Sequence, residues 1–399
     1  MFDAFLFLTS NVPYKKISGD RIATFNTIKG LKLLHPNVKI GVLTFYSKFD
    51  NQYIDLLSKE VDFVYPIKKT FFIRSVWKAF LEGKSLVMGR FFSKNYLNKL
   101  KEIAPNYNVI SAEHTYMAQY FKFLYKHSNR QKFIVNIHVL EFPRYNFLYH
   151  TEKNILKKLM FKYERRRLFQ EEIDSVSNAD VVLSYGEFDD RLIKKHIKNI
   201  LMRVQPLPID ILNYEYSQIE DEKDNQILFF GDYNWFPNYD ALIYILNEIW
   251  PLALNLSKKI ELKLIGRHLP RRTVEKIIRE KKLFNIEVIG EVQDIQKYIK
   301  ESAVIIAPLR MGGGARLKIL ESLAMGKIVI TTKEGAEGIF NKSVLIIANN
   351  STDFAKKMVV FSSDKKIRGT YKEKSRGLIK NTYDLSVSII TFLENLTSL

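Results

Sequence analysis

Short apolar runs alternate with longer amphipathic segments along the whole chain. The runs have the length of buried strands, and the segments between them repeat apolar residues at helical spacing. This alternation is typical of β-α units wound around a parallel sheet, so we predict an α/β fold. In the first half, strands are predicted at residues 2–8, 39–44, 63–65, 108–111, 133–138 and 181–184, and helices at 20–34 and 153–173.

Two prolines and an acidic run interrupt the alternation between Gln205 and Asn225, which is typical of a linker between domains. The pattern then restarts, with strands predicted at residues 226–230, 261–265, 286–289, 304–308, 328–331 and 344–347. A chain of 399 residues is also too long for one ordinary core. We therefore predict two Rossmann-like domains that face an interdomain cleft. Residues 1–208 form the first, 209–225 the linker and 226–383 the second, with a helix at about 384–399 packing back onto the first.

Composition excludes several classes of protein. With 46% hydrophobic and 26% charged residues the chain is globular rather than disordered. It has no cysteine, which rules out disulfides and thiolate metal sites. The N-terminal segment MFDAFLFLTSN lacks the basic start of a signal peptide. No apolar stretch approaches the roughly 18 residues that a spanning helix needs, so we expect a cytoplasmic protein.

The strongest chemical signal is the segment SAVIIAPLRMGGGARLKILESLAMGKIVITTKEGAEGI, which begins at Ser302. A buried strand leads into Gly312, Gly313 and Gly314, and a helix is predicted to begin near residue 315. Glycines let the backbone approach a ligand, and a helix N-terminus attracts anions. These features together suit a diphosphate.

Charged residues follow the glycines. Arg316 and Lys318 are predicted to lie in the first helical turn, where cations are unfavourable unless an anion shares the site. Glu321 follows Lys318 by three residues and therefore shares its helix face. Such a carboxylate can accept hydrogen bonds from ribose hydroxyls. The alternative interpretation is a tight strand-to-helix turn with a solvated charged face.

The segment PLRMGGGARLKILESLAMGKIVITT resembles the C-terminal signature of the glycosyltransferase group 1 family, which is retaining and has the GT-B fold. The resemblance extends upstream through FFGDYNWFPNYDALIYILNEIWP and KLIGRHLP, and covers about 160 residues. The three glycines are typical of a subgroup of bacterial polysaccharide-type enzymes. The resemblance implies a hexosyltransferase that moves a sugar from a nucleotide-diphosphate donor to a glycan or lipid-linked acceptor, in cell-surface polysaccharide or glycoconjugate synthesis.

The resemblance also implies roles for the charged residues. Glu321 would bind the donor ribose, and Lys318 and Arg316 would neutralise the diphosphate together with the backbone of the three glycines. Arg267, after the second strand of this domain, is a further donor-binding candidate.

The chain departs from the family at two places. Many relatives have a second Glu eight residues before the ribose Glu, where this chain has Gly313. Many also carry an Arg and a Lys after the first strand of the second domain, where this chain has Asp232, Asn234 and Asn238. The contacts to the donor sugar therefore stay open.

In the first domain, Gly19 matches the family glycine between the first strand and the first helix. Some relatives have an Arg four residues later, where this chain has Ala23, so Arg21 is the candidate substitute for binding the donor.

A histidine ends the apolar run FIVNIH in the first domain. This residue, His138, resembles the family's strand-ending His near the reacting carbon and is a catalytic candidate together with Lys318 and Arg316. Glu113, His114 and Glu141 are candidates for the acceptor side.

The chemistry does not require a metal ion. Cleavage of a sugar–phosphate bond places negative charge on the departing diphosphate, which fixed cations and helix N–H groups stabilise. No Asp-x-Asp motif lies beside a predicted strand end. We therefore expect no metal and no cofactor, with the nucleotide sugar as co-substrate. The resemblance implies a front-face mechanism, because no nucleophile is evident.

The net charge of +19 is concentrated in two segments. Lys68 to Lys101 contains nine Lys or Arg, a single acid and several aromatic residues, and Lys153 to Arg167 contains seven more cations. Basic and aromatic residues on amphipathic helices suit an anionic membrane surface, which would place the protein peripherally on the inner face of the membrane. The alternative is a solvated face over core aromatics.

Two other functions stay open. A catalytically inactive sugar-nucleotide-binding or partner subunit would keep the fold, and Gly313 favours it because relatives have an acid there. A nucleic-acid-binding protein could also use the positive charge. The basic segments lie in no recognisable nucleic-acid-binding module, however, so we expect no nucleic-acid partner.

Overall fold

The computed structural model describes residues 2–14, 18–69, 83–126, 131–197, 200–314 and 316–397. The chain forms two compact units, and each contains a parallel sheet. Unit 1 comprises Met1–Pro208, Gly313–Ala315 and Leu385–Leu399, and unit 2 comprises Ile209–Gly312 and Arg316–Asp384. The predicted fold class, α/β with two Rossmann-like parallel sheets, is confirmed.

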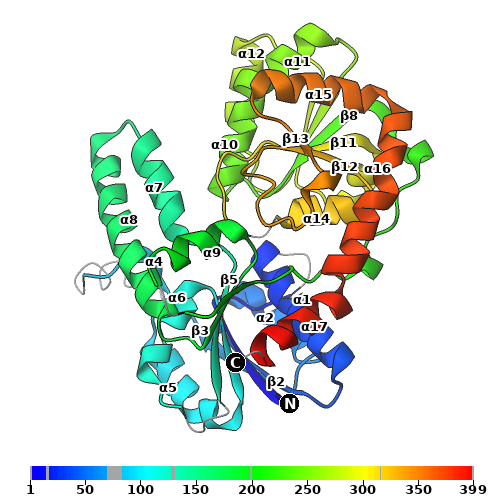
Figure 1. The fold of residues 1–399 in the computed structure, drawn as a ribbon. Coiled ribbons are helices and arrows are strands. Elements are labelled where there is room, and N and C mark those ends of the chain that lie inside the picture. The colour runs from blue at the N-terminus through cyan, green and yellow to red at the C-terminus, as the bar shows by residue number, and fades with distance from the viewer. Residues whose placement is uncertain are drawn as a thin grey trace. The chain divides into compact units, whose positions relative to one another are not determined.

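Unit 1 is built on a parallel sheet of seven strands in the order β3-β2-β1-β4-β5-β6-β7 (Figure 1). The strands are β1 (Ala4–Thr9), β2 (Lys39–Tyr46), β3 (Phe63–Lys68), β4 (Val109–Glu113), β5 (Lys132–Ile137), β6 (Val181–Ser184) and β7 (Met202–Val204). Successive residues of β1 alternate between two cores: Leu6 and Leu8 join one, and Phe5 and Phe7 the other. Both faces of the sheet are thus covered, as parallel sheets require.

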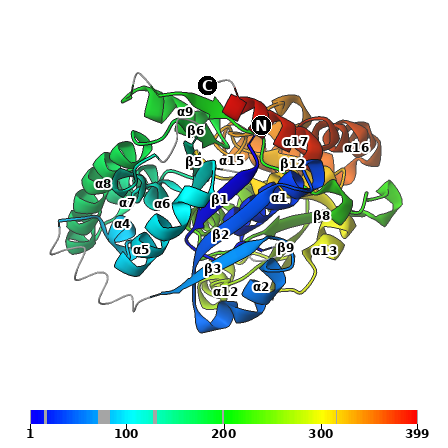
Figure 2. The ribbon, with the colours of Figure 1, turned by 90° about the horizontal axis from the view of Figure 1, so that it is seen from below.

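Helices cover the two faces of this sheet. They are α1 (Gly19–Leu34), α2 (Asn51–Leu57), α4 (Leu86–Arg90), α5 (Lys94–Ile103), α6 (Thr115–Ala118), α7 (Glu141–Thr151), α8 (Ile155–Val176), α9 (Glu187–Lys194) and α17 (Leu385–Thr397). The C-terminal helix α17 packs beside α1 (Figure 2), where Ile389 and Phe392 enter the same core as Phe5. The last residues of the chain therefore complete the first unit.

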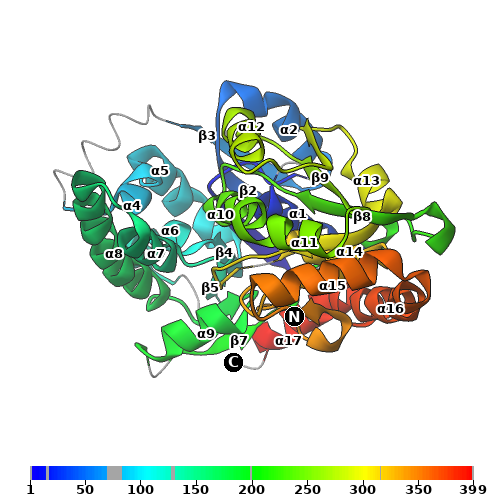
Figure 3. The same ribbon diagram turned by 90° about the horizontal axis from the view of Figure 1, so that it is seen from above.

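Unit 2 has a parallel sheet in the order β10-β9-β8-β11-β12-β13. The strands are β8 (Lys223–Phe230), β9 (Glu261–Ile265), β10 (Ile286–Gly290), β11 (Ser302–Ala307), β12 (Ile328–Thr331) and β13 (Ile346–Ile347). The helices are α10 (Phe236–Tyr244), α11 (Trp250–Leu256), α12 (Arg271–Glu280), α13 (Ile295–Glu301), α14 (Leu317–Ala324), α15 (Ser351–Ser363) and α16 (Lys365–Leu378). Helices α11 and α15 lie side by side (Figure 3), so that Trp250 and Phe354 share one buried core.

The segment before β8 is held inside unit 2 by a buried charge cluster. Glu222 accepts hydrogen bonds from Lys327 Nζ at 2.7 Å, Arg368 Nε at 2.7 Å and Lys372 Nζ at 3.3 Å. A buried carboxylate must be paired in this way to stay ionised. Residues 209–222 therefore belong to a packed domain, although their acidic run and the prolines just before them look like a linker in the sequence.

Most predicted strands match observed ones to within a few residues. The exceptions are β7, which the sequence analysis did not predict, and the last strand, which is shorter than predicted. No helix in the described ranges is long and apolar enough to cross a bilayer.

Candidate functional site

The candidate site of unit 2 lies where β8, β9 and β11 end and α14 begins. Ligands of parallel sheets gather at these carboxyl ends, because helix N-termini and loops meet there. Helix α14 begins at Leu317, two residues later than predicted, because Arg316 has the non-helical angles φ −103° and ψ 57°. Lys318 therefore lies in the first turn as predicted, whereas Arg316 lies at the N-cap.

Lys318 reaches from α14 to the end of β8. Its Nζ donates to the carbonyl of Phe230 at 2.7 Å and to Asn238 Oδ1 at 2.5 Å, and it lies 4.7 Å from the ring centre of Phe229. Burial lowers the pKa of Lys318 to about 7, and repulsion from Arg316 adds to this effect. Both hydrogen-bond acceptors are neutral, so an incoming anion would stabilise the charged ammonium.

Glu321 lies one helical turn after Lys318. Its Oε1 accepts a hydrogen bond from the hydroxyl of Tyr214 at 3.0 Å. Burial raises the pKa of Glu321 to about 7, against the opposing effect of the Tyr214 hydrogen bond. The carboxyl group is therefore poised between its neutral and ionised forms near neutral pH.

Arg316 is buried and joins two loops of unit 2. Its Nη2 donates to the carbonyl oxygens of Met311 at 2.8 Å and Glu334 at 3.2 Å. It thereby links the loop that follows β11 to the loop that follows β12. Its charge also lies close enough to Lys318 to lower the pKa of that ammonium.

Arg267 follows β9 and forms an ion pair with Asp232, which follows β8, at 3.1 Å between Nη2 and Oδ2. His268 Nδ1 lies 3.0 Å from the other carboxylate oxygen of Asp232. The Asp232 carbonyl in turn accepts from Asn238 Nδ2 at 2.9 Å. One polar cluster therefore links Arg267 to Asn238, the hydrogen-bond acceptor of Lys318.

The three glycines do not share one environment. Gly312 belongs to unit 2, whereas Gly313 and Gly314 group with unit 1. The φ angles of Gly313 and Gly314 are 88° and 73°. Side chains rarely tolerate this region of backbone space, so the chain turns here in a way that favours glycine. The acid that many relatives carry at this position would strain this backbone.

In unit 1, His138 follows β5 and is buried. Its Nε2 lies 2.8 Å from Oε2 of Glu113, the last residue of β4. The same carboxylate accepts from Thr24 Oγ1 at 3.0 Å and, through Oε1, from Ser111 Oγ at 2.8 Å. Because Glu113 is only 2% exposed and surrounded by donors, it orients the His138 ring rather than facing an open acceptor side.

The remaining candidates of unit 1 lie at the same strand ends or close by. His114 follows β4 and its ring contacts that of His138 at a tilt of 32°, with 4.5 Å between the ring centres. Glu141 begins α7 and pairs with Arg144 at 2.7 Å. Gly19 begins α1, and Arg21 forms an ion pair with Asp50 at 3.2 Å. The structure thus brings His138, Glu113 and His114 together.

Sequence reasoning missed three residues of these clusters: Asp20 beside His114, Tyr214 on Glu321, and Asn238 as the acceptor of Lys318. Asp20 directly follows the predicted glycine, which could have indicated it. Tyr214 lies in the predicted linker and gave no signal. Asn238 was noted only as a departure from the family pattern.

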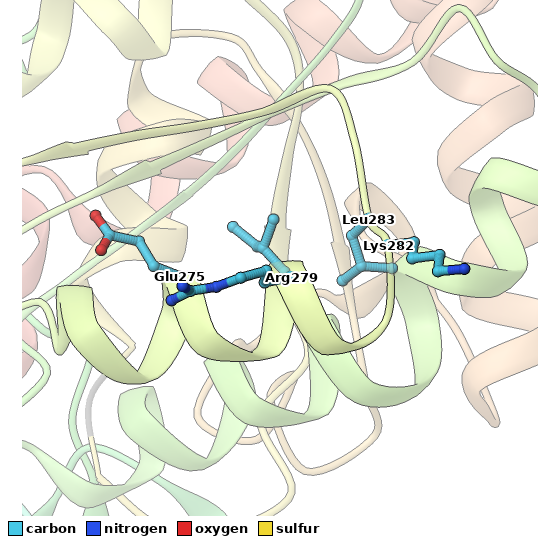
Figure 4. Close-up of a pocket in the computed structure, with 5 residues that line it drawn as sticks. Glu275, Arg279, Lys282 and Leu283 are labelled. Atoms are coloured by element: carbon cyan, nitrogen blue, oxygen red, sulfur yellow. The ribbon is translucent and has the colours of Figure 1, made fainter.

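Two further features do not contribute to these clusters. No three His, Cys, Asp or Glu side chains of the described residues gather as a metal site would require. A shallow pocket of unit 2 lies along α12, lined by Glu275, Ile278, Arg279, Lys282 and Leu283 (Figure 4). It lies where α12 leads into the start of β10, the edge of the sheet opposite the carboxyl ends.

Comparison with known proteins agrees with the geometry of unit 2. Residues 224–364 match the family model described as "Glycosyl transferases group 1". A Klebsiella pneumoniae protein described as "Uncharacterized 44.6 kDa protein in cps region" is 23% identical over 370 residues, which are 90% of each chain. The family match covers the strand ends and α14, where the predicted motif lies.

Two solved structures share the fold over nearly the whole chain. HepE of Anabaena, solved in complex with UDP and glucose, has a TM-score of 0.70 at 15% identity and covers 99% of this chain and 100% of its own. Sucrose-phosphate synthase of Thermosynechococcus elongatus has a TM-score of 0.71 at 13% identity, with 99% of both chains covered. The fold is therefore GT-B, and together with the family match it supports a glycosyltransferase.

Proposed function

We propose that this protein is a retaining glycosyltransferase of the hexosyltransferase type. It would move a sugar from a nucleoside-diphosphate donor to a hydroxyl group of a glycan or lipid-linked acceptor, in cell-surface polysaccharide or glycoconjugate synthesis. The observation that carries the proposal is Lys318, an ammonium group at a helix N-terminus whose acceptors, the Phe230 carbonyl and Asn238, are neutral. A cation placed in this way gains most when an anion binds.

The two charged side chains of α14 would bind different parts of the donor. Lys318 would neutralise the diphosphate, and the carboxylate of Glu321 would accept hydrogen bonds from the ribose. Negative charge grows on the diphosphate as the sugar leaves, so a fixed ammonium stabilises the transition state more than the ground state. Arg316 would add positive potential from the N-cap. Arg267, which pairs with Asp232, would bind the donor from the end of the neighbouring strand β9.

In unit 1, the oriented ring of His138 is the catalytic candidate that would contact the transferred sugar. Glu113 fixes this ring by accepting at 2.8 Å. We propose that the reaction needs no metal, because cations already present in the chain can carry the charge of the leaving group. HepE is described in complex with UDP and with UDP-glucose, and a uridine nucleotide is therefore the first donor to test.

The test uses calorimetric titration and a turnover assay with the whole chain. A panel of nucleotide sugars, beginning with UDP-glucose, is titrated in the presence of EDTA, and nucleoside-diphosphate release is then measured with the donor that binds. We expect Lys318→Met and Glu321→Gln to weaken binding and release. Lys276→Met and Glu280→Gln are matched controls, because both residues are exposed on α12 of the same unit. Equal loss in the controls, or no loss at α14, would contradict the assignment.

The same experiment separates the enzyme from an inactive sugar-nucleotide-binding subunit. An inactive subunit would bind the donor through Lys318 and Glu321 but would release no nucleoside diphosphate, with or without acceptor extracts. Gly313 is the observation that favours this second candidate, since its φ of 88° is strained for any side chain and so disfavours the acid that many relatives have there.

We also propose that unit 1 binds an anionic membrane surface through the tip of the α7–α8 hairpin. The two helices run side by side and are joined at one end (Figure 1). At that end α8 exposes four large apolar side chains: Ile155, Leu156, Leu159 and Met160 are 74%, 78%, 56% and 44% exposed. Lys153, Lys157, Lys158 and Lys162 surround them in the sequence. Apolar side chains ringed by lysines suit insertion at a negatively charged lipid surface.

The other basic segment, Lys68 to Lys101, supports this proposal less. Residues 70–82 lie outside the described ranges. In the described part, Phe91 stacks on Tyr116 and Phe92 on Tyr120, so these aromatic rings face the core of unit 1. Lys84 lies 4.2 Å from the ring centre of Phe92.

Flotation with vesicles tests the membrane proposal. We expect the protein to float with vesicles that contain phosphatidylglycerol and not with phosphatidylcholine alone, and we expect Leu156→Asp to remove this difference. Leu212→Asp is the matched control, since Leu212 in unit 2 is even more exposed than Leu156, at 91%. Equal recovery with both kinds of vesicle would exclude the electrostatic mechanism.

A further inference from the structure

Residues 214–217, which look like part of a linker in the sequence, lie along the C-terminal half of helix α14. The hydroxyl of Tyr214 donates to Oε1 of Glu321 at 3.0 Å. Three residues later, the backbone N–H of Ser217 donates to the carbonyl of Met325 at 3.1 Å. Residues 214–217 lie in no helix or strand. Contacts with α14, rather than a sheet, therefore hold this segment in place.

A glycine allows the segment to come this close to the end of α14. Gly326 follows the C-cap residue of the helix and has a φ of 77°. A Cβ atom added to Gly326 would lie 2.6 Å from Cε2 in the ring of Tyr216. Any side chain here would strain the backbone and displace this ring. The end of α14 is thus shaped to receive the segment.

Arg376, on helix α16, joins the segment to the same helix end. Its Nη1 donates to the carbonyl of Tyr214 at 2.9 Å and to the carbonyl of Ala324, the last residue of α14. The last carbonyls of a helix have no partner within it, and a cation there is stabilised by the helix dipole. The guanidinium carbon also lies 5.5 Å from the ring centre of Tyr216. Arg376 therefore fixes the backbone of Tyr214 relative to the helix that carries Glu321.

The hydroxyl that Arg376 positions determines the state of Glu321. Burial and the nearby carboxylate raise the pKa of Tyr214 above its usual range, so its hydroxyl stays protonated and donates. This hydrogen bond opposes the rise in the pKa of Glu321 that burial causes. Without it the carboxyl group would be neutral over more of the range near pH 7. A neutral carboxyl group accepts hydrogen bonds more weakly than a carboxylate does.

We propose that Arg376 is a positioning residue for ribose recognition: it holds the Tyr214 hydroxyl on Oε1 of Glu321, which leaves Oε2 to accept hydrogen bonds from the ribose. This inference rests on the proposed donor-binding role of Glu321 and deepens it. All of these residues belong to unit 2. The segment before β8 would thus help α14 to distinguish a ribose from a sugar that lacks hydroxyl groups.

The ratio of two affinities tests the proposal. The probes are UDP, ADP and GDP and their 2′,3′-dideoxy counterparts, titrated calorimetrically into the whole chain at pH 7. We expect the wild type to bind at least one ribonucleotide about tenfold more tightly than its counterpart, because a charged acceptor meets the hydroxyl groups. Arg376→Met should lower this ratio about three- to tenfold, the effect of one lost hydrogen bond. The affinity for the dideoxynucleotide should stay unchanged, which a merely destabilised protein would not produce selectively.

A double variant and a change of pH show whether Arg376 acts through Tyr214. Tyr214→Phe should lower the ratio by a similar factor, and adding Arg376→Met should lower it no further, because both changes remove one hydrogen bond. At pH 8.5 the loss should shrink, since Glu321 is then ionised in every variant. Deprotonation of Lys318 at this pH affects both nucleotides of a pair equally and cancels in the ratio.

Lys357→Met is the matched control, because Lys357 also donates to a backbone carbonyl of unit 2, that of Ile347 at 2.8 Å. Arg376→Lys can reach only one of the two carbonyls and should lower the ratio about twofold; it carries the test if Arg376→Met does not fold. If the wild type shows no preference for ribose, or if Glu321→Gln keeps it, the donor-binding role of Glu321 fails and the inference with it. If Glu321→Gln loses the preference but the folded Arg376 variants keep it, only the inference is overturned. An equal loss in Lys357→Met, or a further loss in the double variant, also overturns it.

Discussion

The strand ends of the two units hold their charges in opposite ways. In unit 1 a carboxylate, Glu113, lies at the centre and is surrounded by donors from Thr24, Ser111 and His138. In unit 2 a cation, Lys318, lies at the centre, and its acceptors are a carbonyl and an amide. In the first cluster the carboxylate of Glu113 is fully hydrogen-bonded and orients the ring of His138. In the second cluster the charge of Lys318 has only neutral acceptors, so it can attract an anion. This difference is the basis of our proposal that unit 1 positions neutral sugar groups and unit 2 binds phosphate.

Removal of the central cation should have the largest effect. We expect Lys318→Met to lower the turnover of the donor roughly 100- to 1,000-fold, as loss of one preorganised electrostatic contact typically does. Steady-state kinetics would measure it, with Lys276→Met as the control. A loss below about threefold would show that the charge of Lys318 does not serve the leaving group.

The two carboxylates should respond differently to the same substitution. Glu113→Gln replaces a saturated acceptor with a group that also donates, so it should destabilise unit 1 by about 1–3 kcal/mol. Hydrogen–deuterium exchange of β4 and β5 measures this loss within the unit. Glu321→Gln should instead leave unit 2 as stable or make it more stable at about pH 8. Burial raises the pKa of Glu321 in the folded protein to about 7. The contribution of the protonated carboxyl to the stability of unit 2 is therefore fully present below the pKa of the unfolded chain and is lost as the pH rises through 7.

One outcome would contradict this contrast between Glu113 and Glu321. Equal destabilisation of both units by the two Gln variants would mean that Glu321 is a structural acceptor like Glu113. Unfolding of unit 2 can be followed separately in a Trp77→Phe background, because the two remaining tryptophans, Trp235 and Trp250, both belong to it.

Donor affinity should depend on pH in a bell-shaped manner. Binding requires Lys318 protonated and Glu321 ionised, and both pKa values lie at about 7. Affinity should therefore fall below pH 7 as Glu321 gains its proton and above pH 7 as Lys318 loses its own. Calorimetry across this range measures the curve. Lys318→Arg should flatten the alkaline side of the affinity curve, since Arg stays charged. Glu321→Gln should flatten its acidic side. A monotonic curve in the wild type would contradict the assignment.

The smallest expected effect concerns the hydroxyl of Tyr214. Its hydrogen bond to Glu321 opposes the rise in the pKa of that carboxyl. Tyr214→Phe should therefore shift the acidic side of the profile to higher pH. It should weaken donor binding at pH 7 by about 0.5–1.5 kcal/mol. Tyr216→Phe is the matched control, because its hydroxyl contacts Glu373 instead. Equal profiles for both variants would show that Tyr214 does not tune Glu321.

The sequence alone determined the architecture and half of the proposed donor site. Alternating apolar runs and amphipathic segments predict parallel sheets, because both periods are local properties of the chain. The spacing of Lys318 and Glu321 is likewise local, since three residues on a helix place them on one face. The resemblance to the glycosyltransferase group 1 family rests on this same stretch, and the family model matches it.

Tertiary structure decided which groups face each other across strands. Glu113 meets His138 because β4 and β5 pair in register, with Glu113 opposite Asn136. Asp20 meets His114 across 94 positions of sequence, and Asn238 meets Lys318 across 80. No local period encodes such pairs, since they depend on the order of strands in the sheet and on where each helix begins. The sequence thus predicted which residues carry charge, and only the fold showed that one charge is satisfied and another is not.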